Sequence, residues 1–309
     1  MIQFCKVKIN WKGIFLWSNH FYGICAVLLS MESNFFVLQK MPHIFLLLFI
    51  HIATVVYYTH AYLQEQHDGI YDERTKWYQH HKKYLSIRQI VFTCVCIWLG
   101  FIKMDLMNAF LKSSLWLKLI LCFSFFISIV YYLPKRPLFS LQSFRHIGIL
   151  KSLSIAWVWT IICYVFPIWF ELRENFTSLL DNPVFWFHFT FLFLFILILS
   201  ILFDIKDLYR DQKEMVKTIV AQHGINYTLK KVIAPLLLFN SLLTIIGYIK
   251  HYFSIGEIII NLLTLGLTYI VAKNINNYKT IHRNLLMIDG LMIIKALLSI
   301  VLWIFFLKS

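Results

Sequence analysis

Long apolar runs alternate along the whole chain with short segments that carry charges or proline. A helix needs about 20 residues to cross the hydrocarbon core of a bilayer. Nine runs approach or reach that length, at 14–31, 42–60, 88–103, 115–133, 150–170, 184–203, 232–250, 254–272 and 285–307. Because backbone polar groups must find internal partners in lipid, each run predicts a transmembrane helix. The pattern therefore predicts an all-α, polytopic membrane protein with nine transmembrane helices.

Composition supports this fold class and the domain organisation. Hydrophobic residues make up 60% of the 309 residues, whereas soluble domains are close to half apolar. No linker, low-complexity tract or separate soluble segment interrupts the series of apolar runs. We therefore expect residues 1–309 to form a single integral-membrane domain.

The basic residues are distributed unequally between the two sides of the expected membrane. If the N-terminus is cytoplasmic, 21 of the 29 Lys and Arg residues lie in cytoplasmic segments, seven lie outside and Lys295 lies within the last span. This bias predicts a cytoplasmic N-terminus and an external C-terminus. We expect the protein to reside in the inner (plasma) membrane of a bacterium. The net charge of +14 is then explained by anionic lipid headgroups, and no nucleic-acid motif accompanies it.

Three aspartates follow the sixth apolar run, in the segment SILFDIKDLYRDQKEMVKT. If 200–217 is one helix, Asp204, Asp207 and Asp211 lie within an arc of about 60°. Acids three or four residues apart repel each other mildly, so another group should neutralise them. Mg²⁺ is one candidate, because it binds one or two carboxylates together with water and phosphate oxygens. A solvated helix face without a ligand is the alternative.

The segment FDIKDLYRDQKEMVKTIVAQHG resembles the second aspartate-rich motif of the UbiA superfamily of intramembrane prenyltransferases, specifically a divergent bacterial branch. The motif is D-x-x-D-x-x-x-D, followed by a basic stretch and T-[LI]-x-x-x-x-G. The matching residues are Asp204, Asp207, Asp211, Thr218 and Gly224. The nine spans, the YYLPKRP segment after span four and the NLLMIDGLMIIKALL segment in the last span are also similar to the family. The resemblance implies a UbiA-like bundle with its active-site cavity at the cytoplasmic side.

The first aspartate-rich motif of the family, N-D-x-x-D-x-x-x-D after span two, has no verbatim copy here. In one alignment Thr59 and His60 replace Asn-Asp, and the motif is lost. In the other, Gln64 and Glu65 replace Asn-Asp, and Asp68 and Asp72 retain the spacing. An ordinary hydrated loop remains a further interpretation of this segment.

The resemblance implies a chemistry and a set of site residues. It implies Mg²⁺-dependent transfer of an isoprenyl group from a prenyl diphosphate to a small-molecule or lipid acceptor. The implied magnesium ligands are Asp204, Asp207, Asp211, Glu65, Asp68 and Asp72, and the aspartates of the second motif are the implied catalytic residues. The implied diphosphate contacts are Gln64, Lys135, Arg136 and Arg145.

Two other classes of protein stay open at this point. A degenerate first motif fits a non-catalytic protein that binds an isoprenoid or another lipid. A small transporter is the third class, although the acidic residues lie at the membrane face rather than near the middle, where transport sites are usually found.

Overall fold

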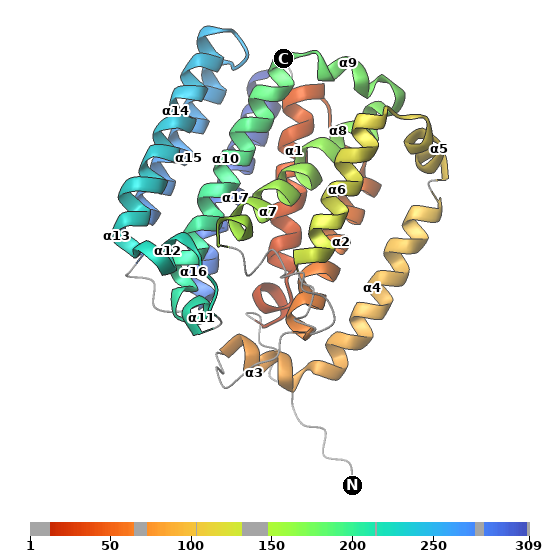
Figure 1. The fold of residues 1–309 in the computed structure, drawn as a ribbon. Coiled ribbons are helices and arrows are strands. Elements are labelled where there is room, and N and C mark those ends of the chain that lie inside the picture. Colours follow the sequence, from red (N-terminus) through yellow and green to blue (C-terminus); the bar gives the residue numbers. More distant parts are fainter. Residues whose placement is uncertain are drawn as a thin grey trace.

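Helices form all the regular structure in the part of the chain that the computed structural model describes, which comprises residues 13–64, 73–102, 104–131, 148–213, 215–275 and 281–307. The helices run back and forth between the two ends of a bundle (Figure 1). The all-α fold class predicted from the sequence is therefore confirmed.

The first half of the bundle contains α1 (His20–Leu38), α2 (Ile44–Gln64), α3 (Glu73–His80), α4 (Lys82–Ile102), α5 (Met104–Lys112), α6 (Leu115–Tyr131), α7 (Gly148–Thr160), α8 (Phe166–Leu172) and α9 (Thr177–Leu180). The second half contains α10 (Pro183–Lys206), α11 (Leu208–Lys213), α12 (Ile219–His223), α13 (Ile225–Tyr227), α14 (Ala234–Ile249), α15 (Ile255–Lys273), α16 (Ile281–Ile288) and α17 (Gly290–Leu302). Short π- and 3-10 segments extend or join them: η1 (Gly13–Trp17), η3 (Ile161–Val165), η4 (Arg173–Phe176), η5 (Thr228–Ile233) and η7 (Trp303–Leu307).

Eight helical segments of the described chain are long and apolar enough to cross a bilayer. They are His20–Leu38, Ile44–Leu63, Lys82–Ile102, Gly148–Leu180, Pro183–Lys206, Ile225–Ile249, Ile255–Lys273 and Arg283–Phe305. The ninth expected span, 115–133, corresponds to α6, which has 17 residues and is shorter than the others. The protein is an integral membrane protein, but the expected count of nine spans is not confirmed.

The centre of the bundle is formed by α1, α7 and α10. Helix α1 packs against α2 and α17, and α7 packs against α10 and α6. Helix α10 is almost wholly apolar and buries most of its side chains, among them the fully buried Phe195 and Leu202. Peripheral helices such as α4 and α6 instead expose large apolar side chains, for example Trp98 and Phe125. In a membrane protein such side chains face lipid, so the core lies around α10.

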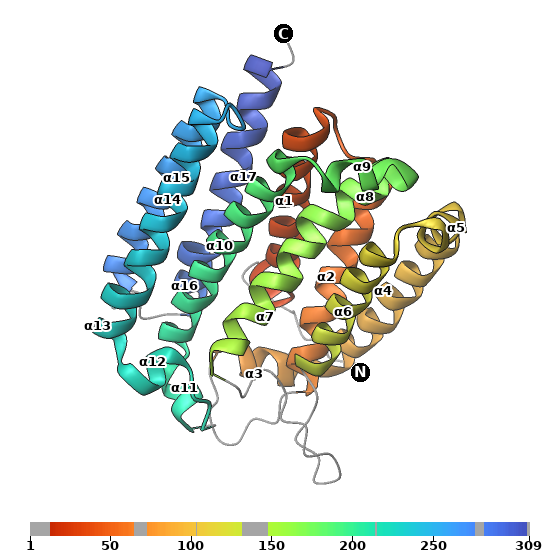
Figure 2. The same ribbon diagram turned by 45° about the horizontal axis from the view of Figure 1, so that its top comes forward.

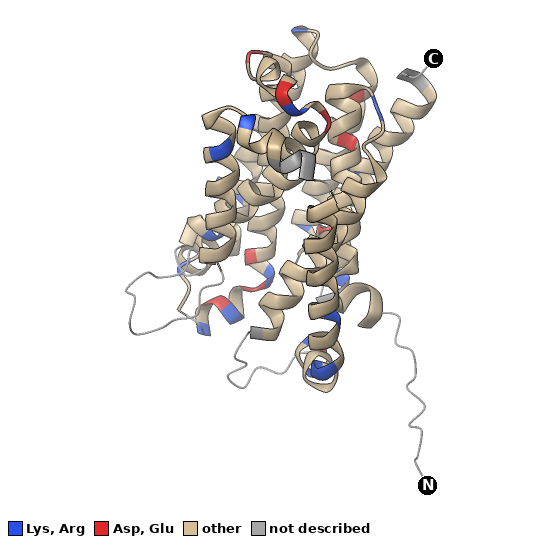
Figure 3. Ribbon diagram, turned by 90° about the vertical axis from the view of Figure 1, so that its right-hand side faces the viewer, with Lys and Arg blue, Asp and Glu red and all other residues tan. Residues whose placement is uncertain are grey.

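Charged residues lie mostly toward the two ends of the bundle, and few occur along the helices between them (Figure 3). One of these ends carries α3, α11 and α12, three short helices that lie beyond the ends of the long ones (Figures 1 and 2). We call it the α11 end. The three aspartates of the second acidic motif belong to this end of the molecule.

Candidate functional site: an acid–lysine centre and its cavity

The second acidic motif is not a single helix. Helix α10 ends at Lys206, and Asp207 is its C-cap residue, with backbone angles of φ −86° and ψ 7°. Helix α11 then runs only from Leu208 to Lys213. The expectation of one continuous helix over 200–217 is therefore wrong. The break at Asp207 leaves Asp204 in the last turn of α10 and Asp211 in α11, the next helix.

The tail of the motif has a local structural role. The buried Thr218 is the N-cap of α12, and its hydroxyl accepts a hydrogen bond from the backbone N–H of Ala221. Gly224 ends that helix with φ 81° and ψ 169°, a conformation that only glycine adopts readily. Both residues thus shape the turn that follows the aspartates.

Lys151 of α7 lies between two of the three aspartates. Its Nζ is 3.0 Å from Asp204 Oδ1 and 2.9 and 2.8 Å from Asp211 Oδ1 and Oδ2. The hydroxyl of Ser152 donates a hydrogen bond of 2.5 Å to Asp204 Oδ2. All four of these side chains are buried. The neutralising group that the aspartate spacing calls for is therefore a lysine from a different helix. We call Lys151, Ser152, Asp204 and Asp211 the acid–lysine centre.

The acid–lysine centre carries one positive charge for two carboxyl groups. Burial raises the pKa of Asp211 to about 6, although the nearby Lys151 ammonium opposes this rise. The cause is desolvation, which disfavours the charged form of a carboxyl group. Full ionisation leaves the centre with one negative charge in excess, so it can take up a proton or interact with a further cation.

A cavity of about 810 Å³, which includes space open to solvent, begins at this centre. Its charged lining comes from Lys151, Asp204, Asp207, Arg210 and Asp289. The second aspartate of the motif thus faces the same space as the first. Asp211 is not among the lining residues, and it interacts with the centre through Lys151.

The rest of the cavity wall is aromatic and apolar. Tyr22 and Tyr58 line it with their rings stacked, 4.5 Å between centroids, and Trp159 Nε1 donates a hydrogen bond of 2.7 Å to the Tyr58 hydroxyl. Leu199 and Met292 add aliphatic surface. A ligand with a charged head and an apolar body matches this division of the wall.

The polar lining residues that were not predicted as site residues include Lys151, Arg210, Ser200 and Asp289. Ser200 lies one helical turn before Asp204, and Asp289 lies immediately before α17. Both are buried. The sequence did contain a signal for Asp289, because an acid inside an apolar transmembrane run is costly and usually functional.

The predicted magnesium site can be tested against this geometry. Both oxygens of Asp211 accept hydrogen bonds from Lys151, and the oxygens of Asp204 contact Lys151 and Ser152. Within the described residues, no three His, Cys, Asp or Glu side chains come together in a way that could hold a metal ion. Magnesium at Asp204 and Asp211 would have to displace the Lys151 ammonium, because the two cations repel each other. Asp204 and Asp211 therefore do not fit a magnesium ion as they stand.

The remaining predicted site residues cannot be placed. Glu65, Asp68, Asp72, Lys135, Arg136 and Arg145 lie outside the described residues, and Gln64 ends α2 with its side chain undescribed. Their roles stay predictions.

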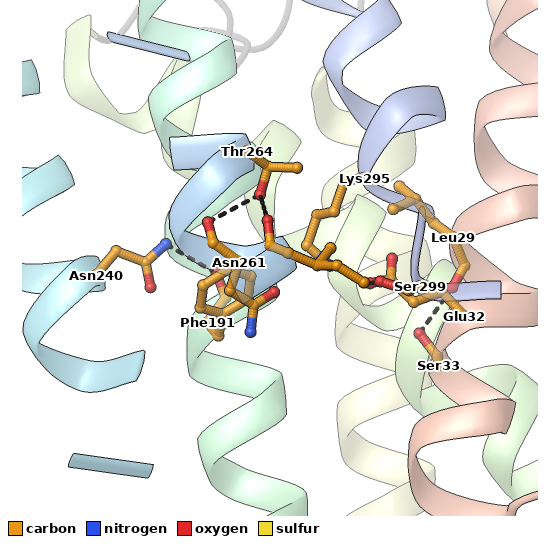
Figure 4. A network of polar contacts seen from close by, with 10 residues as sticks. Leu29, Glu32, Ser33, Phe191, Asn240, Asn261, Thr264, Lys295 and Ser299 are labelled. Atoms are coloured by element: carbon orange, nitrogen blue, oxygen red, sulfur yellow. Dashed lines mark hydrogen bonds and ion pairs between the residues drawn. The ribbon is translucent and has the colours of Figure 1, made fainter. Parts of the chain in front are cut away.

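A second buried ion pair lies further from the α11 end. Lys295 of α17 bonds to Glu32 Oε1 of α1, and the Ser299 hydroxyl donates a hydrogen bond of 2.8 Å to the same oxygen. Figure 4 shows these side chains meeting between the two helices, with Phe191 of α10 nearby. The Lys295 ammonium is 5.1 Å from the centroid of the Phe191 ring. This pair joins the first and last long helices of the bundle.

The fold and the site together define a class: a polytopic α-helical membrane protein with an acid-lined, aromatic-walled cavity at one end. Its fold is UbiA-like. The chain is similar to the solved structure of a UbiA homolog from Archaeoglobus fulgidus bound to GPP and Mg²⁺, with a TM-score of 0.55 and 17% sequence identity over 92% of this chain and 97% of that one. No family model matches, and no curated protein matches. The UbiA-like fold expected from the aspartate motif is confirmed.

Proposed function

We propose that the chain, acting as one integral-membrane domain, is a prenyltransferase that moves an isoprenyl group from a prenyl diphosphate to an acceptor within the membrane. The observation that carries the proposal is the cavity, which has a charged centre at one end and an aromatic wall beyond it. The UbiA homolog of similar fold was solved with GPP, a prenyl diphosphate, and Mg²⁺, which supports a donor of this class.

The diphosphate is placed at the charged end of the cavity in this proposal. Lys151 and Arg210 line that end and can donate charge-assisted hydrogen bonds to phosphate oxygens. The predicted contacts Gln64, Lys135, Arg136 and Arg145 would add to them. The prenyl chain then lies along the aromatic and aliphatic wall, where its burial is favourable.

Mg²⁺ remains part of the proposal, with the predicted ligands Glu65, Asp68 and Asp72 and with Asp207, which lines the cavity. When bound, the ion would neutralise the diphosphate as a leaving group. Asp204 and Asp211 are proposed to act through Lys151, by holding its ammonium at the cavity wall. The faces of Tyr22, Tyr58 and Trp159 would stabilise positive charge that develops on the allylic carbon.

The orientation of the protein in the membrane is also a proposal. The excess of basic residues supports a cytoplasmic N-terminus, and the cavity would then open toward the cytoplasm. The prenyl diphosphate would reach it from that side of a bacterial inner membrane.

One observation favours a second candidate function. Lys151 already forms ion pairs with two of the three aspartates, so the chain could bind an isoprenoid diphosphate without transferring it. Binding without release of inorganic diphosphate distinguishes this function from catalysis.

The test uses the full chain in lipid nanodiscs with geranyl or geranylgeranyl diphosphate, with Mg²⁺ or with EDTA. Thermal stability reports binding, and released diphosphate reports ionisation of the donor. We expect the donor to stabilise the wild type. Its apparent affinity should fall at least tenfold in Asp207→Asn and in Lys151→Met. The control is Asp181→Asn, an exposed acid that follows α9, at the opposite end of α10 from Asp204. Equal behaviour of all four proteins, or no response to either donor, would refute the proposal.

A further inference from the structure

We propose that Asp289 and Ser200 form a subsite for the hydroxyl group of the acceptor, deeper in the cavity than the diphosphate end. This inference rests on the proposed function, because it names the class of acceptor: a molecule that presents an O–H group. Both residues line the cavity, and they come from opposite parts of the chain, α10 and the start of α17.

The first step of the argument is that both residues have an unsatisfied polar atom. Asp289 is 2% exposed and Ser200 is 4% exposed. Asp289 Oδ2 and the Ser200 hydroxyl have no hydrogen-bond partner among the described residues. Buried polar groups in proteins are nearly always satisfied, and an unsatisfied one is costly. Two such atoms on residues that line one cavity favour a ligand that supplies the partners.

The second step is the chemistry of the two atoms. A carboxylate oxygen accepts hydrogen bonds, while a serine hydroxyl both donates and accepts. A hydroxyl group on the ligand complements them, because it can donate to Asp289 Oδ2 and accept from Ser200. Tyr22 already hydrogen-bonds to the Asp289 carboxyl, and Arg74 and Lys206 interact with it electrostatically. These neighbours hold the carboxyl in place, and Oδ2 is the oxygen that lacks a partner among the described residues.

The third step is the position of the subsite. Ser200 is four residues from Asp204 along α10, which is about one helical turn or 6 Å. A hydroxyl oxygen held at Ser200 and Asp289 is thus close to a donor whose diphosphate lies at the acid–lysine centre. In the transfer step the bond between the allylic carbon and the diphosphate oxygen breaks, and its electron pair leaves with the diphosphate. A bond forms between that carbon and the acceptor oxygen, and the hydroxyl proton moves to Asp289 Oδ2.

The binding test compares two probes of similar shape, 4-propylphenol and 4-propylanisole, of which only the phenol can donate a hydrogen bond. Thermal stabilisation of the detergent-solubilised full chain gives their apparent affinities. We expect the phenol to bind the wild type about tenfold more tightly than the ether, because only the phenol can donate a hydrogen bond to the Asp289 carboxyl. We expect that preference to disappear in Asp289→Asn and to weaken in Ser200→Ala, and to persist in the exposed control Asp181→Asn. No preference in the wild type, or an unchanged preference in both variants, overturns the subsite.

The activity test supplies geranyl diphosphate and Mg²⁺ with either probe. We expect an aryl ether product from the phenol and none from the anisole, with turnover in Asp289→Asn lowered by about 10²-fold or more while geranyl diphosphate still stabilises the variant. Transfer to carbon, or unchanged turnover in Asp289→Asn, contradicts the assignment. If geranyl diphosphate fails to stabilise even the wild type, the proposed function fails, whereas the phenol preference still decides the subsite. Ser200→Ala keeps both tests decisive if Asp289→Asn does not fold.

Discussion

Lys151 and Lys295 are both buried and both contact carboxylates, yet their surroundings differ in charge and in access. Lys295 pairs with one carboxylate, Glu32, and Ser299 and the rings of Phe191 and Phe195 lie close by. Lys151 meets two carboxylates and lines a cavity of about 810 Å³. The first pair is balanced in charge and borders smaller cavities, of about 280 and 230 Å³, the second of which Glu257 also lines. The second has an excess of negative charge beside a larger cavity that opens to solvent, and this difference separates a structural pair from a candidate site.

The largest expected effect is on the balanced pair. Lys295→Met leaves Glu32 without its countercharge, and we expect a loss of about 3–5 kcal/mol in the free energy of unfolding. Chemical denaturation in detergent micelles measures it. The double variant Glu32→Leu/Lys295→Met should recover most of the loss, because a buried ion pair can be replaced by apolar groups. An unaffected single variant would show that Glu32 is not held by this lysine.

The next effect compares how the Lys151 and Lys295 variants respond to magnesium. Lys151→Met should lose about 3 kcal/mol in EDTA, because it leaves two buried carboxylates facing each other. At 10 mM Mg²⁺ and a Kd of about 1 mM, it should regain about 1.4 kcal/mol. This response should exceed that of the wild type and of Lys295→Met, and Asp204→Asn in the same chain should abolish it. A wild type that responds as strongly would mean that magnesium enters the acid–lysine centre without displacing Lys151.

The third effect depends on pH. Burial raises the pKa of Asp211 from its ordinary value near 3.8 to about 6. The carboxyl group of Asp211 therefore binds a proton more tightly in the folded protein than in the unfolded chain. The contribution of Asp211 to stability is then largest below pH 4 and falls as the pH rises to 6, by at most about 2–3 kcal/mol. Thermal unfolding at pH 4 to 7 should show a smaller decline in Asp211→Asn than in the wild type. The same decline in both would assign it to other groups.

The smallest effect comes from the two serines. Ser152→Ala and Ser299→Ala each remove one hydroxyl that donates to a buried carboxylate, and each should cost about 1.5 kcal/mol. We expect water from the cavity to replace the Ser152 hydroxyl in part, so Ser299→Ala should cost more. Unfolding measurements on the two variants compare them directly, and the opposite order would argue that the Lys295 pair is the more hydrated one.

Features set by local sequence were predictable. The apolar runs gave the helical fold and most of the spans, because the hydrocarbon thickness fixes their length. The motif through Asp204, Asp207 and Asp211 pointed to the UbiA-like fold. The break at Asp207 was missed, since the segment contains no proline or glycine before Gly224 to mark it.

Features set by distant pairing were not predictable. Spacing along one helix showed that the aspartates lack a neighbouring cation, but not that Lys151 supplies it from 53 residues before Asp204 and 60 before Asp211. Glu32 and Lys295 stand 263 residues apart, so the pattern of neither helix identifies the other. Asp289 was visible as an acid in an apolar run, and only the fold brings it to the cavity wall.

The link between Glu32 and Lys295 also has a consequence for biosynthesis. Helix α1 enters the membrane before Lys295 has been translated, and the intervening 263 residues take roughly 13–50 seconds to synthesise at about 5–20 residues per second. During that interval Glu32 lacks its final partner, and a charged residue within a membrane helix costs about 3 kcal/mol. The arrival of α17 removes this cost. The last helix therefore acts as a closing step in assembly, and truncation before Lys295 should leave a chain that membrane quality control degrades.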